Sequence, residues 1–349
     1  MKPFAISNKV KKITGLVATA TVFAATIAAS SVASAETSIK FSNDWKWEGP
    51  AAPLLHALDS GYFKDAGLDV KMDTGKGSLE AIPRVASGTY DMGAADINSL
   101  IKFRDQNPDL EVKGVFVIYN KPPFAIVGRK SLGVNGPKDL EGKTLGAPAP
   151  DGAYAQWSAF VKANDIDASQ VKIENVGFPV REPMLAQGKV DAITGFSFSS
   201  FINLKNNEVP EDDISVILMA DHGLDLYGNV LIVNPKFAEE NPEAVTGFLS
   251  AVIKGVHETV ASPESAVKAV MNHNDVAREP VELERLKMAL DQNIITEEVK
   301  ANGIGGIDMA RLEKSMDQIA DTYEFKNRPA AADIFDDSFL PAAGERMVK

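Results

Sequence analysis

The chain has 349 residues, a formal net charge of −12 and no cysteine. Without cysteine it can form neither disulfide bonds nor thiolate metal sites, and the acidic surplus disfavours nucleic acid as a partner. A chain of this length can bury a large core and usually divides into two lobes.

The first 35 residues have the pattern of a secretory signal peptide. Lysines stand at positions 2, 9, 11 and 12, the stretch 13–32 is small and uncharged, and "ASA" at 33–35 resembles a cleavage site. A membrane anchor is the alternative, because about 20 uncharged residues can span a bilayer. The Ala/Thr/Ser-rich composition favours the signal peptide. We predict cleavage after Ala35 and a periplasmic location, which leaves 314 residues with a net charge of −16.

In chain order, the mature part alternates short apolar strands with amphipathic helices. We predict strands at 38–42, 68–72, 90–96 and 112–119, with helices at 50–61 and 77–88. The alternation repeats, with helices at 154–165 and 181–190 and strands at 124–129, 171–176, 191–196, 214–219 and 229–234. From Pro235 onward the pattern is mostly helical. This alternation indicates an α/β fold, and we expect the chain to cross between lobes near 115–128 and 216–233.

The sequence offers little support for catalysis. None of the four histidines has the spacing of a metal site, and no Gly-x-Ser-x-Gly motif is present. The stretch "DTGKGS" (73–78) lacks the spacing of a phosphate-binding loop, so we interpret it as a strand-to-helix turn. We expect a protein that is not an enzyme and that uses neither a cofactor nor a metal.

Polar and aromatic residues gather where the predicted strands end. In open α/β sheets, ligands bind outside the carboxyl ends of the strands, close to helix N-termini. Residues in these loops that core packing does not require are therefore candidates for ligand binding. The candidates are Trp45, Trp47, Glu48, Asp96, Asn98, Asp151, Tyr154, Phe196, Ser197 and Asp221.

Several stretches, in order and spacing, resemble one family of binding proteins. They include "GYFKDAGLDV" (61–70), "ASGTYDMGAAD" (86–96) and "DLEGKTLGAPAPDGAY" (139–154). The chain resembles type II periplasmic substrate-binding proteins, in the branch that serves thiamine-pyrimidine precursors, taurine, alkanesulfonates and nitrate. The resemblance implies two α/β lobes, each a mixed, mostly parallel sheet flanked by helices. Two crossover strands would join the lobes, which would close on a small molecule like a hinge.

The same resemblance implies partners and lobe boundaries. The protein would deliver its ligand to the permease and ATPase of an ABC importer in the inner membrane, and we expect a monomer. Lobe one would be discontinuous and comprise residues 36–124 and 228–349, whereas lobe two would comprise residues 125–227.

Acidic residues near the candidate loops bear on the choice of ligand. Relatives that bind sulfonate or nitrate generally offer hydroxyls, backbone N–H groups and a cation, helped by a helix N-terminus. In this chain Asp151 opens the second-lobe helix, where it would cap the helix and repel an anion. Asp44, Glu48, Asp96 and Asp221 lie near comparable loops.

We therefore hypothesise a planar heterocyclic or amine-bearing ligand, and an aminopyrimidine thiamine precursor meets this description. Trp45 and Phe196 would stack on it or face a cationic centre. One of the carboxylates of Glu48, Asp96 and Asp151 would accept its N–H groups, and Asn98 would orient it.

Other functions stay open. The ligand could be of the taurine or alkanesulfonate type, and a ligand-sensing subunit without transport would use the same fold. Some relatives of the thiamine-precursor branch are pyrimidine synthases that rely on a Cys-rich, His-assisted iron site. A chain without cysteine and with an export signal departs from that pattern.

Overall fold

The computed structural model describes residues 1, 3–4 and 36–348. The chain divides into two units, residues 1–34 and 35–349, and every described helix and strand belongs to the second. The apolar stretch of the predicted signal peptide and its cleavage site lie outside the described residues. Among the described helices, none is long and apolar enough to cross a membrane.

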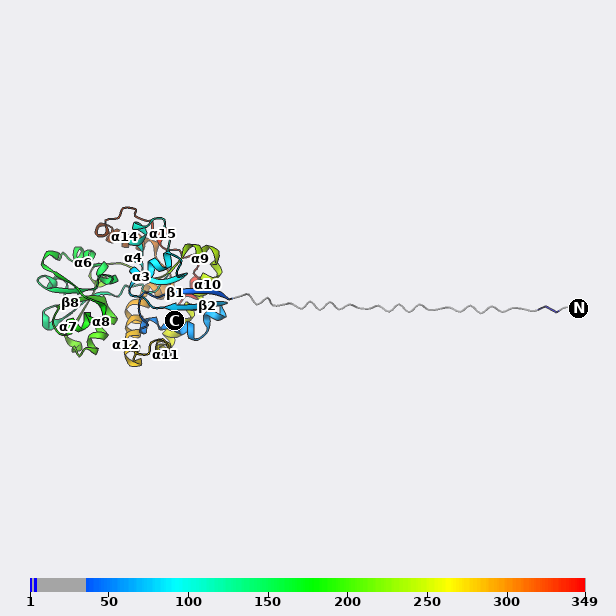
Figure 1. Ribbon diagram of the computed structural model, residues 1–349, viewed down its shortest axis with the longest axis horizontal. Coiled ribbons are helices and arrows are strands. Elements are labelled where there is room, and N and C mark those ends of the chain that lie inside the picture. Colours follow the sequence, from blue (N-terminus) through cyan, green and yellow to red (C-terminus); the bar gives the residue numbers. More distant parts are fainter. Residues whose placement is uncertain (2, 5–35, 349) are drawn as a thin grey trace. The chain divides into compact units, whose positions relative to one another are not determined.

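The first sheet, whose strands β1 and β2 are labelled in Figure 1, has five strands in the order β2-β1-β3-β10-β4. Strands β2, β1 and β3 run parallel, whereas β10 runs antiparallel to both of its neighbours, β3 and β4. A strand from late in the chain is thus inserted between two early ones. The strands are β1 Thr37–Ser42, β2 Leu68–Asp73, β3 Met92–Asp96, β4 Lys113–Val117 and β10 Asn229–Val233.

The second sheet also has five strands, in the order β7-β6-β8-β5-β9. Strand β6 runs parallel to β7 and β8, and β5 runs antiparallel to β8 and β9. The strands are β5 Phe124–Arg129, β6 Thr144–Ala147, β7 Lys172–Asn175, β8 Ala192–Phe196 and β9 Ile214–Leu218.

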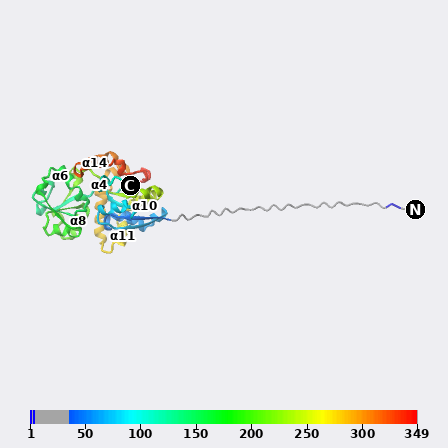
Figure 2. The same ribbon diagram turned by 45° about the horizontal axis from the view of Figure 1, so that its top comes forward.

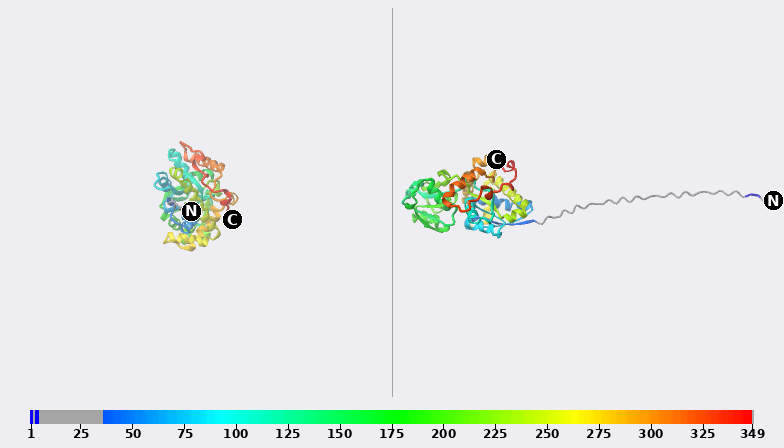
Figure 3. Two further views of the ribbon diagram at one scale, coloured as in Figure 1. Left: turned by 90° about the vertical axis from the view of Figure 1, so that its right-hand side faces the viewer. Right: turned by 90° about the horizontal axis from the view of Figure 1, so that it is seen from above.

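Helices cover both faces of the first sheet, and this explains why strand β10 is apolar throughout. Side chains alternate along a strand, so Leu231 and Val233 join the core beneath α1 and α10–α12, and Val230 and Ile232 join the core beneath α4, α14 and α15. The two groups of helices lie on opposite sides of the sheet (Figures 2 and 3). Strands buried on both faces become continuous apolar runs. The helices of this lobe are α1 Ala52–Asp59, α2 Tyr62–Asp65, α3 Ser78–Ala86, α4 Ile97–Gln106, α9 Pro235–Glu240, α10 Pro242–Ala261, α11 Pro263–His273, α12 Glu279–Ala289, α13 Glu297–Asn302, α14 Met309–Tyr323 and α15 Ala331–Ile334.

The second sheet is sandwiched in the same way. Along β5, Ile126 packs into one core with residues of α6, and Ala125 and Val127 pack into another with residues of α7 and α8. The helices of this lobe are α5 Gly152–Ala155, α6 Trp157–Ala163, α7 Arg181–Ala186 and α8 Ser197–Asn206. The predicted fold class, two α/β lobes built on mixed sheets, is confirmed.

The elements differ from the sequence prediction in detail. The helix predicted at 154–165 is two helices, α5 and α6, which meet at Gln156. In the mostly helical stretch predicted after Pro235, α12 is followed by a π-helical turn over Leu290–Ile294. Residues 118–123 and 219–228 connect the two sheets outside the strands, and the second connection begins with a 3₁₀ turn, Met219–His222.

One arginine of α14 ties the two connections together. The Arg311 Nη2 group donates to the backbone oxygens of Asn120 (3.0 Å) in one connection and Leu226 (2.7 Å) in the other. Its Nε group donates to Asp225 Oδ1 (3.0 Å), and its guanidinium carbon lies 4.0 Å from the centre of the Tyr227 ring. The planar fork of donors suits arginine to this role. Both connections are therefore fixed to the same helix.

Candidate ligand-binding site

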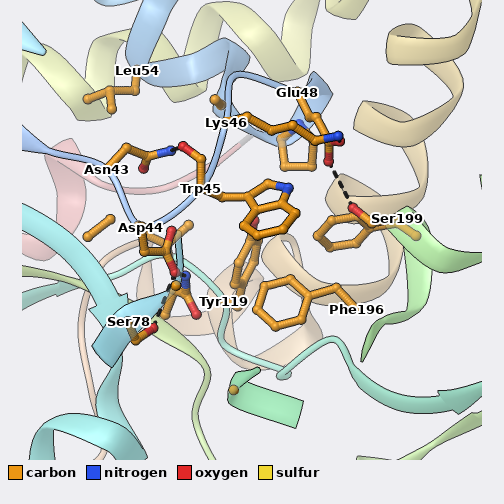
Figure 4. A pocket seen from close by; sticks show the side chains of 18 of the residues that line it. Asn43, Asp44, Trp45, Lys46, Glu48, Leu54, Ser78, Tyr119, Phe196 and Ser199 are labelled. Carbon is orange, nitrogen blue, oxygen red and sulfur yellow. Dashed lines mark hydrogen bonds and ion pairs between the residues drawn. The ribbon is translucent and has the colours of Figure 1, made fainter. Parts of the chain in front are cut away.

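A cavity of about 140 Å³ lies between the two lobes and is lined by residues of both (Figure 4). Its walls are partly aromatic and partly polar. The aromatic lining residues are Trp45, Phe116, Tyr119, Phe178, Phe196 and Phe198. The polar lining residues are Asn43, Asp44, Lys46, Glu48, Ser78, Asp151, Arg181, Ser199 and Asn229.

The loop after β1 separates the two tryptophans that stand two residues apart in the sequence. The Asn43 side chain donates to the Trp45 backbone oxygen (2.8 Å), which bends the chain away from strand geometry. The Trp45 ring consequently faces the cavity and meets Phe178 of the second lobe edge-on, with ring centres 4.7 Å apart. Trp47 instead packs into the core of the first lobe and is 7% exposed.

Asp44 is a buried carboxylate whose hydrogen-bond partners are neutral. Its Oδ2 atom accepts hydrogen bonds from Asn229 Nδ2 (2.7 Å) and Ser78 Oγ (3.3 Å) (Figure 4). Burial raises the pKa of Asp44 to about 6, against the lowering effect of these hydrogen bonds. Asn229 Oδ1 is itself buried without a hydrogen-bond partner among the described residues. This corner of the cavity therefore holds an acceptor that a ligand N–H group can satisfy.

The stretch "DTGKGS" forms the turn that holds Asp44 in place. The Gly77 N–H donates to the Asp44 backbone oxygen (2.6 Å). A Cβ atom on Gly75 would lie 2.5 Å from the Asn43 backbone oxygen, which real Cβ contacts essentially never reach, so this approach needs glycine. The interpretation of the stretch as a strand-to-helix turn is consistent with its place between β2 and α3.

Asp151 is a buried carboxylate of the second lobe, and its partners include a cation. Its Oδ1 accepts from the Ala153 N–H at the start of α5 (3.2 Å), and its Oδ2 accepts from Thr194 Oγ1 (2.7 Å). Arg181 Nη1 lies 3.5 Å from Oδ2. Burial raises the pKa of Asp151, and Arg181 opposes that rise. Arg181 also donates to Glu182 Oε1 (2.6 Å), so this wall is a closed ionic cluster.

Glu48 lines the cavity but has its oxygens engaged by the protein. Its Oε2 accepts from Ser199 Oγ of the second lobe (3.0 Å), and its Oε1 lies 3.1 Å from Lys46 Nζ (Figure 4). On the opposite side, Phe196 contacts Tyr119 edge-on, with ring centres 6.1 Å apart. Trp45, Tyr119 and Phe196 face the same space (Figure 4).

Of the ten candidate residues, Trp45, Glu48, Asp151 and Phe196 line this cavity. The other six lie elsewhere. Asp96 is the N-cap of α4 and accepts from the backbone N–H groups of Asn98 and Ser99, and Asn98 donates to Asp96 and to the Tyr227 backbone oxygen. Trp47 is in the core, and Asp221 is exposed and pairs with Lys121 at 2.6 Å. Tyr154 packs against a core cluster, and Ser197 is buried at the start of α8.

Several lining residues were not among the candidates. Asn229 stands at the start of β10, and because β10 runs antiparallel, its first residue reaches the cleft at which the neighbouring parallel strands end. A search of strand carboxyl ends therefore misses it. The polar and aromatic lining residues that were missed are Asn43, Asp44, Lys46, Ser78, Phe116, Tyr119, Phe178, Arg181, Phe198, Ser199 and Asn229. Asp44, Lys46 and Arg181 could have been included on their charge alone.

Two lobes of this topology with a ligand-sized cavity between them define the type II periplasmic binding-protein fold. Residues 50–266 match the model of the family described as NMT1/THI5 like. The chain belongs to this family, so the resemblance noted in the sequence is confirmed.

The relatives of this chain include both binding proteins and enzymes. The chain is 27% identical over 295 residues to the formylaminopyrimidine-binding protein of Halalkalibacterium halodurans, covering 83% of this chain and 86% of the relative. It is 24% identical over 252 residues to the 4-amino-5-hydroxymethyl-2-methylpyrimidine phosphate synthase of Aspergillus parasiticus, covering 70% and 72%. The solved periplasmic aliphatic sulphonate binding protein SsuA of Escherichia coli has a TM-score of 0.66 at 12% identity, covering 87% of this chain and 92% of SsuA. That last likeness concerns the fold.

Proposed function

We propose that this protein is the extracytoplasmic solute-binding component of an ABC importer and that it captures a planar nitrogen heterocycle of the aminopyrimidine type. The observation that carries the proposal is the position of Asp44 beside Trp45 at the wall of the interlobe cavity. Family membership and the formylaminopyrimidine-binding relative support the same ligand class.

The cavity chemistry suits a flat ring with N–H donors. Trp45 offers a ring surface for aromatic packing. Asp44 and Asn229 offer buried acceptor oxygens, and leaving Asn229 Oδ1 unpaired costs free energy that a ligand N–H group would recover. The same corner binds a donor-rich ligand in preference to one that carries only acceptors.

An anionic ligand such as taurine is a poorer match. The cations that line the cavity, Lys46 and Arg181, are both paired with protein carboxylates. An incoming sulfonate would compete with Glu48 at Lys46, and with Asp151 and Glu182 at Arg181. The pairs of Arg181 are buried, and breaking a buried ion pair leaves an uncompensated charge, which is strongly unfavourable. The Lys46 pair is exposed on the lysine side and costs less to break.

We also propose lobe boundaries, location and assembly state. Residues 36–124 and 228–349 form lobe one and residues 125–227 form lobe two, which the sheet membership of the strands supports except at Phe124, the first residue of β5. The leader pattern supports export to the periplasm with cleavage after Ala35. The protein acts as a monomer that presents its ligand to a membrane permease and its ATPase.

The ligand class is tested by calorimetry on protein that has been unfolded and refolded to remove any carried molecule. We expect formylaminopyrimidine to bind and to raise the melting temperature. At a concentration of one hundred times its Kd, it should add about 2.7 kcal/mol to the free energy of unfolding. Taurine should produce no comparable shift. Binding of taurine that equals or exceeds that of the aminopyrimidine would contradict the proposal.

A second measurement separates binding from the synthase activity named for some relatives. The native protein is purified without refolding, and the small molecule that it carries is identified by mass spectrometry. An aminopyrimidine recovered chemically unchanged after incubation with the protein supports a binding role. Conversion to a new pyrimidine product would favour the enzyme instead.

A further inference from the structure

The two lobes touch through a buried charged cluster next to the cavity. Helix α12 of the first lobe contacts helix α8 of the second. Between them lie Glu48, Glu282 and Arg285, which are 6%, 5% and 2% exposed. Arg285 does not line the ligand cavity and belongs to no motif identified in the sequence.

Arg285 contacts both lobes at once. Its Nη1 group lies 2.5 Å from Glu282 Oε1 and 3.7 Å from Glu48 Oε1, both in the first lobe. Its Nη2 group donates to Asn203 Oδ1 of α8 in the second lobe (2.9 Å). One guanidinium thus links the cavity-lining loop to the opposite lobe.

The partners of Arg285 complete the link. Glu48 accepts from Ser199 (3.0 Å), which stands four residues before Asn203 and so on the same face of α8. Glu282 Oε2 accepts from the Gly49 N–H (2.7 Å), directly after Glu48. A Cβ atom on Gly49 would lie 2.2 Å from the Glu282 backbone oxygen, so α12 presses against this loop.

The charges of the cluster make it sensitive to the removal of Arg285. Two buried carboxylates surround one buried guanidinium, and Lys46 supplies a further positive charge from a half-exposed position. Without Arg285, Glu48 and Glu282 would remain buried with their charges uncompensated on that side, which favours separation of the lobes and entry of water.

We propose that Arg285 is a positioning residue for ligand capture: by joining Glu48 and Glu282 of the first lobe to Asn203 of the second, it holds the lobes closed around the cavity. Only the ligand readout below rests on the proposed function. Closure itself is measurable without a ligand.

The absence of cysteine allows a direct measurement of closure. Lys64→Cys in the first lobe and Lys172→Cys in the second place single thiols at exposed positions for a pair of fluorescent dyes. Energy transfer between the dyes then reports the lobe separation of the ligand-free protein. The labelled background is compared with Arg285→Ala and Arg285→Lys. It is also compared with Asn203→Ala, which removes the contact of Arg285 with the second lobe and leaves its first-lobe contacts in place. Lys205→Ala is the matched control because the Lys205–Glu284 pair (2.6 Å) also bridges α8 and α12 but is partly exposed.

We expect Arg285→Ala and Asn203→Ala to lose the high-transfer population, Arg285→Lys to retain part of it, and Lys205→Ala to keep it.

With formylaminopyrimidine as the probe, the dissociation rate should rise about tenfold for Arg285→Ala, because the loss of a buried charged hydrogen-bond partner acts mainly on dissociation. If Arg285→Ala fails to fold, Asn203→Ala decides the question. A wild-type distribution in Asn203→Ala, or a wild type without a high-transfer population, would overturn the proposal. Failure of the probe to bind would count against the proposed ligand and leave the closure result standing.

Discussion

The two walls of the cavity carry the same residue type in opposite electrostatic settings. Asp44 in the first lobe and Asp151 in the second are buried to a similar degree, at 8% and 5% exposure. The partners of Asp44 are the neutral groups of Ser78 and Asn229, whereas Asp151 faces Arg181 at 3.5 Å. Burial alone therefore does not determine the role of a carboxylate, because its role also depends on whether a neighbouring cation compensates its charge.

The two walls therefore have different roles, one in stability and the other in ligand binding. The charge of Asp151 is balanced within the protein, so its main effect is on the stability of the second lobe and the start of α5. The charge of Asp44 is solvated only by neutral donors, so a ligand donor placed beside it gains a strong hydrogen bond. We expect substitutions in the second wall to change stability with little effect on affinity, and substitutions in the first wall to change affinity.

The largest expected effect comes from removing the cation of the second wall. Arg181→Gln leaves Asp151 and Glu182 buried without their shared partner. The free energy of unfolding should fall by about 3–5 kcal/mol, measured by urea denaturation. Arg328→Gln, at a surface pair with Asp317 (2.6 Å), should cost less than about 1 kcal/mol. Equal losses in the two variants would mean that the cluster is not stabilising.

The next effect tests the first wall. Asp44→Asn preserves the shape of the side chain but removes the charge, so the affinity for formylaminopyrimidine should fall by about 1.5–3 kcal/mol, the range for hydrogen bonds to charged groups. Calorimetry measures the change, and Asp151→Asn serves as the control at comparable burial. If Asp151→Asn weakened binding as much as Asp44→Asn, the contrast between the walls would be wrong.

A pH titration of stability examines the same contrast without a ligand. The pKa of Asp44 is raised from 3.8 to about 6 in the folded protein, so the folded state binds the proton more tightly than the unfolded state. Its contribution to stability is complete below pH 4 and is lost as the pH rises through about 6, by about 3 kcal/mol in all. Comparison with Asp44→Asn between pH 4 and 6 separates the contribution of Asp44 to stability from that of Asp96, whose pKa is also raised. Parallel curves for the two proteins would show that Asp44 does not titrate in this range.

The smallest effect concerns the aromatic part of the first wall. Trp45→Ala should weaken binding of the aminopyrimidine by about 1 kcal/mol, because an aromatic pair is worth roughly that beyond its buried area. Trp45→Phe should recover most of the loss. A Trp45→Ala variant with unchanged calorimetric affinity would remove this residue from the binding site.

Much of the fold was predictable because periodicity and turn residues mark the strands and helices. The alternation along β1 and the apolar run of β10 each identify a strand. The site was less predictable because a helix cap and a ligand contact look the same in a sequence. Asp96 has the pattern of a binding residue, yet its oxygens are taken up by the N–H groups that open α4.

Trp45 and Trp47 show a second limit. Both share the parity of the strand that precedes them, and only the turn made by the Asn43 side chain sends one ring to the cavity and the other to the core. Asn229 shows a third, because the sense in which a strand runs within its sheet is a tertiary property. The role of Arg285 could not be predicted from the sequence, because Arg285 approaches Glu48 only when α12, a helix from much later in the chain, packs against the loop after β1.

The insertion of β10 between β3 and β4 also sets the order in which the protein can fold. Because the chain is synthesised from its N-terminus, strands β1 to β4 are present long before β10, and the whole second lobe must follow before β10 arrives. Until then β3 and β4 have open edges, the kind that pair with other chains. Contacts so distant in sequence also slow folding. The topology that brings Asn229 to the cavity thus delays completion of the first lobe until the second lobe has been made.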